Sequence, residues 1–96
     1  MKIQHKKLGI DIEMPEILQG ALEDFEKEIH PAIEDINENG LLVAKFNSVL
    51  VRAACKVGWL PGFDVESIPT TQPATITFIA NNVSEAVTKA REIPPQ

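Results

Sequence analysis

Residues 41–60, LLVAKFNSVLVRAACKVGWL, carry the pattern that decides how this chain folds. Apolar residues recur here at the three- and four-residue spacing of an amphipathic helix. The main stripe consists of Leu42, Phe46, Val49, Leu50, Ala53 and Val57. A second stripe of smaller side chains consists of Ala44, Ser48, Val51 and Cys55. Because two stripes leave little polar surface, we predict a central helix over residues 41–57 with neighbours on several sides.

The central helix is expected to end at Gly58, since a glycine just past the last periodic residue readily adopts the left-handed geometry of a helix cap. The single cysteine and the single tryptophan, Cys55 and Trp59, lie beside this end. A reactive thiol is disfavoured there, because the C-terminal end of a helix opposes a thiolate. The cations Arg52 and Lys56 fall on a different side of the helix, so we interpret Cys55 as a packed small residue. Trp59 is interpreted as a core anchor, with a binding hot spot as the alternative.

A β-strand is predicted near the N-terminus. The stretch KLGIDIEM, residues 7–14, alternates apolar with polar or small residues, as expected for a strand with one buried face. Its apolar positions are Leu8, Ile10 and Ile12. Ile3 does not share this alternation, and Gly9 is expected to mark a bulge that absorbs the difference. A lone strand cannot satisfy its backbone, and three partners stay open: a hairpin within the first twelve residues, the segment Val57–Val65, or another chain.

Further helices are predicted over residues 15–29, 32–38 and 73–91. Pro15 suits the first turn of a helix, whereas Pro31 disfavours helical geometry at His30 and should break or kink the helix there. The pair Asn39-Gly40 is expected to turn the chain after residue 38. The stretch TITFIA, residues 75–80, is rich enough in β-branched residues for a strand, but the helical spacing continues to Ala90 and favours a helix.

The predicted fold is therefore mostly α: three to four helices with a short N-terminal β-strand or hairpin. A chain of 96 residues forms one small domain, here residues 1–96, with a single core. One cysteine fits a reducing compartment. The sequence has no secretion signal and no apolar stretch long enough to cross a bilayer, so we expect a cytoplasmic protein that does not bind membranes.

The charges are segregated along the chain. Residues 1–10 carry a formal charge of +3, residues 11–38 carry −9, residues 39–60 carry +3 and residues 61–96 carry −2, for a net charge of −5. Such blocks indicate either neighbours in space that attract each other or separate faces for a partner. The long acidic block argues against a nucleic-acid partner, because phosphate-binding domains usually carry a basic excess.

No sequence pattern indicates catalysis. The two histidines and the cysteine, His5, His30 and Cys55, are too far apart to form a spaced metal-binding pair. Glycine-rich phosphate loops, nucleophile elbows and dinucleotide fingerprints are missing from the sequence. We therefore predict a protein that is not an enzyme, with no cofactor and no metal.

Candidate partner-binding residues come from three places. The strand contributes its apolar face, the central helix contributes a basic ridge (Lys45, Arg52 and Lys56), and the connector after it contributes aromatic side chains. The full set is Leu8, Ile10, Ile12, Lys45, Arg52, Lys56, Trp59 and Phe63. The basic ridge has two readings: pairing with the acidic first helix of the same chain, or docking onto an acidic surface of a partner. The first reading is preferred.

Four segments together resemble a known group of proteins. They are HKKLGIDIEMPE (residues 5–16), VRAACKVGWL (residues 51–60), P-x-x-I-x-F-I-A-x-x-V-x-x-A (residues 73–86) and IPP (residues 93–95). Their order resembles small structural-module proteins of tailed bacteriophages, most of all the tail assembly chaperones. Those proteins are short, acidic and helical, and they bind a tape-measure or tail-tube protein. The resemblance covers most of the chain as a pattern of segments, and it assigns no binding residue to a position.

The sequence thus supports two functional hypotheses. The first is a non-enzymatic factor in phage tail morphogenesis, located in the host cytoplasm or on the virion, that binds another protein and could form homo-oligomers through its N-terminal strand. The second is a phage-encoded acidic inhibitor that blocks a bacterial enzyme or defence complex. An inhibitor that mimics nucleic acid needs its carboxylates unpaired on one open face, whereas a chaperone needs exposed apolar area.

Overall fold

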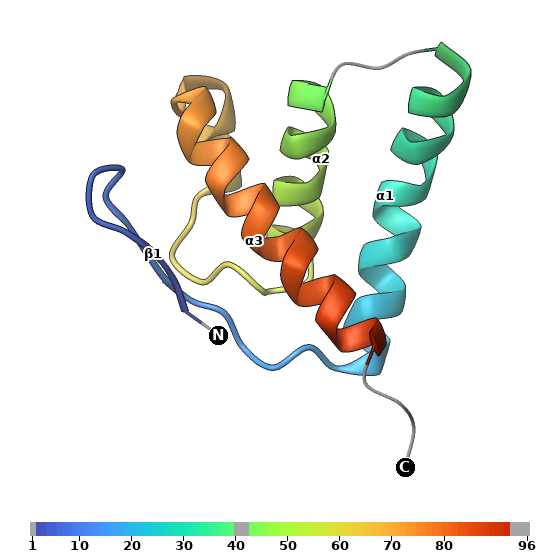
Figure 1. Cartoon of the computed structure of the whole chain (residues 1–96), viewed down its shortest axis with the longest axis horizontal. Helices are drawn as coiled ribbons and strands as arrows, with labels where there is room; N and C mark the ends of the chain where they lie inside the picture. Colours follow the sequence, from blue (N-terminus) through green and yellow to red (C-terminus); the bar gives the residue numbers. More distant parts are fainter. Residues whose placement is uncertain (1, 40–42, 93–96) are drawn as a thin grey trace.

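The computed structural model describes residues 2–39 and 43–92. Its elements are β1 (Lys2–His5), β2 (Ile10–Glu13), α1 (Gln19–Asn39), α2 (Val43–Lys56), the 3₁₀ helix η1 (Val65–Thr70) and α3 (Pro73–Glu92). The two strands form an antiparallel hairpin at one end of a mostly helical domain (Figure 1). The predicted fold class, a small helical domain with a short N-terminal hairpin, is confirmed.

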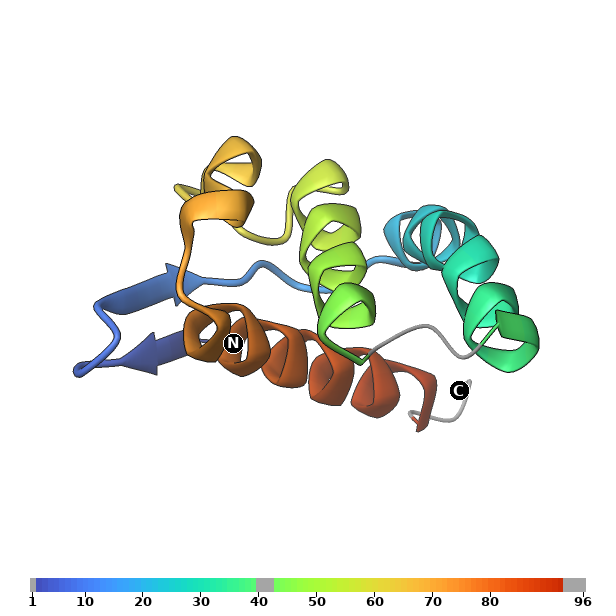
Figure 2. The same cartoon turned by 90° about the horizontal axis from the view of Figure 1, so that it is seen from above.

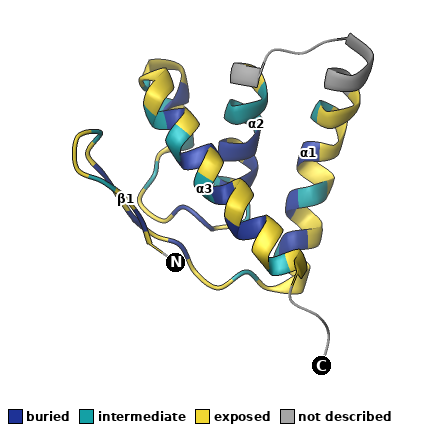
Figure 3. Cartoon of the chain, viewed as in Figure 1, coloured by how far each residue is buried: buried dark blue, intermediate teal, exposed yellow. Residues whose placement is uncertain are grey.

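Helix α2 lies at the centre of the domain. It packs against α1 on one side, against α3 on another, and also against η1 (Figures 1 and 2). Both of its predicted stripes contribute buried side chains, including Leu50 and Ala53 from the main stripe and Val51 from the second. Ala54, between the stripes, is buried as well. The expectation of a central helix with several neighbours is therefore confirmed, and the dark inner faces in Figure 3 mark the resulting core.

The C-terminal end of α2 is capped as the sequence predicts. Gly58 has a φ of +81°, and its N–H donates to the carbonyl of Cys55 at 3.1 Å. The N–H of Trp59 donates to the carbonyl of Ala54 at 2.9 Å, so two of the last helical carbonyls are satisfied by one Schellman-type turn. The turn directs Trp59 inward against Phe25 of α1, with ring centroids 4.8 Å apart. Trp59 is 1% exposed, in agreement with the core-anchor interpretation.

The N-terminal strand pairs within the chain. β1 and β2 are antiparallel, with Ile3 opposite Ile12 and His5 opposite Ile10. Of the three partners that the sequence left open, the hairpin is the one observed. The predicted bulge at Gly9 is wrong: Gly9, with a φ of +69°, lies in the turn, and its N–H donates to the carbonyl of Lys6 at 3.2 Å. Ile3 falls outside the alternation of residues 7–14 because this turn reverses the chain, and it packs on the same face as Ile12.

The predicted helices over residues 15–29 and 32–38 are replaced by one helix. α1 begins at Gln19, after a non-helical segment at residues 14–18, and it continues through Pro31 to Asn39. Pro31 removes one backbone donor, but Leu22, Phe25 and Ile29 bury one face of the helix, and that packing outweighs the loss. Gly40 and residues 41–42 lie outside the described residues, and so does the start predicted for the central helix.

The C-terminal third agrees with its prediction. α3 covers residues 75–80, so the helical spacing outweighed the β-branched composition there. Its buried side chains include Ile76, Ile79 and Val83, and the helix packs against α2. Before α3, η1 is capped by Asp64, whose Oδ1 accepts the N–H of Glu66 at 3.0 Å.

Candidate functional site

A small groove lies where the hairpin, the connector after α2 and the start of α3 meet. We call it the β2 groove. Its volume is about 210 Å³, and its lining residues are Leu8, Gly9, Ile10, Asp11, Ile12, Pro61, Gly62, Phe63, Thr75 and Ile79. Segments from three parts of the sequence thus form its walls, and the connector runs beside β2 in both views (Figures 1 and 2).

The alternation of strand side chains shows that the groove follows an edge of β2. Ile10 and Ile12 point into the core, whereas the Asp11 side chain between them is 64% exposed on the opposite face of the sheet. A cavity that touches all three consecutive residues must run along the side of the strand, because neither face alone presents them all. None of the lining residues belongs to β1. The groove therefore follows the edge of β2 that points away from β1.

Four of the predicted partner-binding residues meet in the β2 groove. They are Leu8, Ile10, Ile12 and Phe63. The structure places Trp59 in the core instead. It also places the basic ridge of Lys45, Arg52 and Lys56 on the exposed side of α2, outside the groove lining.

One residue of the basic ridge pairs with the acidic helix of the same chain, and the other two do not. The Nζ of Lys56 lies 2.7 Å from the Oε1 of Glu28 on α1, which is the predicted pairing with the acidic helix. Both side chains are largely exposed, so this pair contributes little to stability. Lys45 and Arg52 form no ion pair with any residue that the structure describes, and their cations are solvated.

Sequence reasoning missed the other half of the groove. Pro61-Gly62 is a turn dipeptide, and that signal could have suggested a chain reversal beside the strand. Asp11 is one of the polar residues in the alternating pattern of residues 7–14, and that pattern gave no sign of a groove beside it. Thr75 and Ile79 carried no signal, because their position beside β2 depends on how α3 packs.

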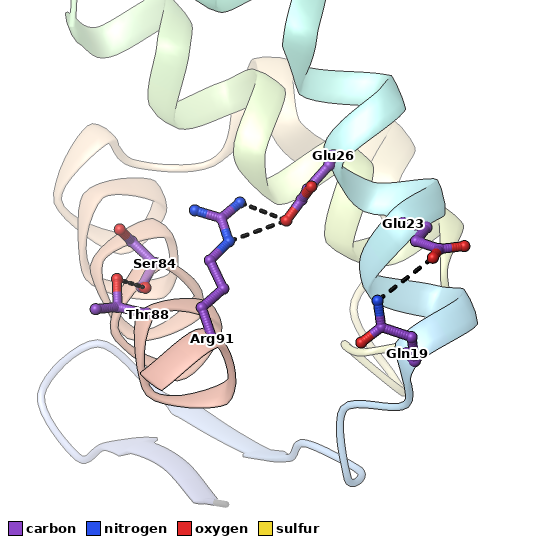
Figure 4. Close-up of polar contacts among 6 residues, drawn as sticks. All are labelled: Gln19, Glu23, Glu26, Ser84, Thr88 and Arg91. Atoms are coloured by element: carbon purple, nitrogen blue, oxygen red, sulfur yellow. Dashed lines mark hydrogen bonds and ion pairs between the residues drawn. The ribbon is translucent and has the colours of Figure 1, made fainter. Parts of the chain in front are cut away.

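The acidic surface of α1 is partly neutralised within the chain. The Nη2 and Nε atoms of Arg91 on α3 lie 2.7 Å and 2.9 Å from the Oε1 of Glu26, and these contacts bridge two helices (Figure 4). Glu23 accepts a hydrogen bond from Gln19 in the same figure. With Glu28 held by Lys56, two carboxylates of this helix are paired with cations of other helices.

The thiol and the imidazoles lie apart. Burial raises the pKa of the Cys55 thiol, and this effect exceeds the opposing influence of Arg52, while Asp64 raises the pKa further. The Nδ1 of His5 accepts the N–H of Leu8 at 3.3 Å, and its ring meets Phe78 edge-to-face with centroids 4.9 Å apart. Within residues 2–39 and 43–92, no group of three His, Cys, Asp or Glu side chains could hold a metal ion.

Larger depressions in the surface lie away from the hairpin edge. One of about 470 Å³ is lined, among the described residues, by a single face of α1, which includes Glu23, Lys27 and His30. Another, of about 250 Å³, lies between residues 14–17 and the C-terminal half of α3, with Ala86 and Ala90 in its wall. A third, of about 400 Å³, lies between α1 and α2, with Asp24, Glu28 and Lys56 in its wall. None of these three adjoins the outer edge of β2, so among the described residues the β2 groove is the depression that a strand edge faces.

Comparison with known proteins adds nothing to this geometry. No protein-family model, no curated protein and no solved structure matches this chain. Among the helices that the structure describes, none is long and apolar enough to cross a membrane. The candidate site therefore depends on the chain's own residues.

Proposed function

We propose that this chain is a non-enzymatic protein-binding factor that presents the β2 groove to its partner. The observation that carries the proposal is an edge of β2 that faces an open groove, whose apolar walls include the half-buried Leu8 and Phe63. Apolar contacts beside a strand edge are a common basis for protein recognition.

The chemistry of the groove supports binding more than catalysis. Asp11 is the one titratable side chain in its lining. A single exposed carboxylate offers no partner for acid–base or nucleophilic chemistry. The volume of about 210 Å³ is also below the roughly 300–1,000 Å³ of typical small-molecule sites.

The resemblance to tail assembly chaperones supplies the setting of the proposal. In that setting the partner is a tape-measure or tail-tube protein of the same phage, and the chain acts in the host cytoplasm before the tail is complete. The exposed Leu18, which is 64% accessible, and Ile33, which is 38% accessible, add apolar area outside the groove. The acidic-inhibitor hypothesis ranks below this one, because Glu26 and Glu28 are paired within the chain.

A pull-down from phage-infected cells tests this function. Tagged wild-type chain should recover a tail component, and recovery of a host nuclease or defence subunit instead would overturn the proposal. Thr75→Arg is the matched groove variant, because Thr75 is a half-buried lining residue and a long side chain there fills the groove. Thr77→Arg on the same helix is its control, because Thr77 is exposed and is not a lining residue. The first variant should lose the partner and the second should retain it.

A further inference from the structure

We infer that the β2 groove binds an extended peptide segment, which adds as a third strand to the outer edge of β2. The inference rests on the proposed protein-binding function and names the conformation of the partner at that same site. Three features of the groove lead to it: the backbone of β2, the shape of the walls and the charge beside them.

The backbone of β2 offers unpaired hydrogen-bonding groups. In an antiparallel pair, every second residue of a strand directs its N–H and C=O away from the neighbouring strand. In the described chain β2 has one neighbouring strand, β1, so half of its backbone groups point away from β1, toward the side on which the groove lies. Outside helices and strands, none of the backbone hydrogen bonds between described residues reaches residues 10–13. An added strand would satisfy these groups, as edge strands do when they capture a peptide.

The walls of the groove give an added strand apolar side chains to contact. Residues 61–63 form the wall opposite β2, and Thr75 and Ile79 of α3 form the floor. A strand places alternate side chains on opposite faces, so a peptide there would direct every second side chain toward Phe63 and Thr75, which are half-buried. The peptide therefore needs apolar residues in alternation.

Asp11 offers the peptide one carboxylate with which a basic residue can pair. The Asp11 carboxylate faces outward, and its one ion pair within the described chain is with Lys2 at 3.6 Å, where both side chains are more than half exposed. Asp64, directly after the Phe63 wall, is exposed and adds a second negative charge nearby. A Lys or Arg on the outward face of the peptide can pair across the strands with Asp11. Lys6 and Lys7 at the hairpin turn favour a neutral or acidic residue at that end of the peptide.

The test begins with a selection from a random decapeptide library on the immobilised full chain. Enriched peptides should alternate apolar residues, carry Lys or Arg in the outward positions, and lack proline. Titration of the best peptide into ¹⁵N-labelled chain should shift the amide signals of residues 10–13 and 61–63. Thr75→Arg should weaken binding at least tenfold, whereas Thr77→Arg should stay within twofold of wild type.

A second measurement does not depend on the folding of any variant. The selected peptide is N-methylated at every second residue, in two alternating sets. The set that faces β2 should lose at least tenfold in affinity because its donors are blocked, and the other set should bind within threefold. If both sets lost affinity equally, or both kept it, strand addition would be wrong. Amide shifts confined to another surface, or a selection that enriches no peptide, would also overturn it.

The outcomes separate this inference from the proposed function. A tail protein that is recovered by pull-down but shifts amides elsewhere overturns the groove and leaves the protein-binding function standing. A second copy of the chain is the other candidate occupant, through its own β1 edge. If dilution alone shifts the amides of residues 2–5 and 10–13 together, that copy fills the groove and the peptide inference is wrong.

Discussion

Trp59 is the residue at which three parts of the fold meet. Its N–H closes the cap of α2, its ring packs on Phe25 of α1, and the connector to η1 begins one residue later. No other residue joins a helix cap and a ring contact in the described chain. The stretch of sequence that held the only cysteine and tryptophan is thus a structural junction, while the site lies beside it.

Trp59→Ala should lower the free energy of unfolding by about 3–5 kcal/mol, because it removes a large buried ring from a packed core. Urea denaturation followed by circular dichroism measures the change. Phe63→Ala serves as the comparison, since Phe63 is half-buried in the wall of the β2 groove and should cost less. A loss for Trp59→Ala no greater than that for Phe63→Ala would contradict its role as the core anchor.

Cys55 should react slowly with a thiol reagent in the folded chain. Burial raises the pKa of its thiol, so at a given pH the reactive thiolate is scarcer than in a free cysteine. The rate of modification by a disulfide reagent should rise with pH and reach its midpoint above that of a short cysteine peptide. Unfolding in urea should accelerate the reaction at pH 8. A midpoint below that of the peptide would indicate an activated cysteine instead.

At the scale of elements, α1 shows how packing overrides a local break signal. The helix passes through Pro31, whose ring prevents a backbone hydrogen bond to the carbonyl of Lys27 four residues earlier. What the helix gains is a continuous apolar face against α2, with Phe25 and Ile29 on either side of a helical turn. Pro31 should therefore lower the free energy of unfolding, and replacing it should reveal by how much.

Pro31→Ala should raise the free energy of unfolding by about 2–2.6 kcal/mol. Removal of a helix-interior proline restores about 3 kcal/mol, and the greater freedom of the unfolded chain offsets about 0.4–1 kcal/mol of it. Pro15→Ala is the matched control, because Pro15 is exposed in the non-helical segment before α1 and should give no gain. If Pro31→Ala were neutral or destabilising, the helix would end near His30, as the local sequence suggests.

The whole molecule is a flat domain, 41 × 34 × 19 Å, with the hairpin at one end and α1 at the other (Figures 1 and 2). The basic N-terminal block and the acidic helix are therefore separated in space, and the blocks that do meet are α1 with α2 and α3. The ion pairs that join these helices are Glu28–Lys56 and Glu26–Arg91. Local stability against unfolding is expected to be highest in the central helix α2 and lower in the hairpin.

Hydrogen exchange should show the slowest amides in α2, at residues 50–54, and faster exchange in β1 and β2. α2 packs against three elements, whereas each strand of the hairpin has four residues and one neighbouring strand. A two-stranded hairpin is marginal without support and depends on its packing against the helices. Exchange followed by mass spectrometry or NMR gives the order, and hairpin amides as slow as those of α2 would contradict it.

The sequence by itself determined the elements whose signals are local and periodic. The two stripes of residues 41–57 required a helix with several neighbours, Gly58 required its cap, and the spacing to Ala90 required a helix through residues 75–80. Among the candidate partner-binding residues that the sequence predicts, Leu8, Ile10, Ile12 and Phe63 line the β2 groove. They were candidates because they are apolar side chains of the strand and of the connector.

Only the tertiary structure decided which of these features meet. The partner of the N-terminal strand, the continuity of α1 through Pro31 and the β2 groove all depend on contacts between residues distant in the chain. Thr75 and Ile79 enter the groove through the packing of α3, which no local pattern encodes. The physical reason is that hydrophobic burial is non-directional: periodicity specifies the face that must be buried, and the complete set of elements decides what covers it.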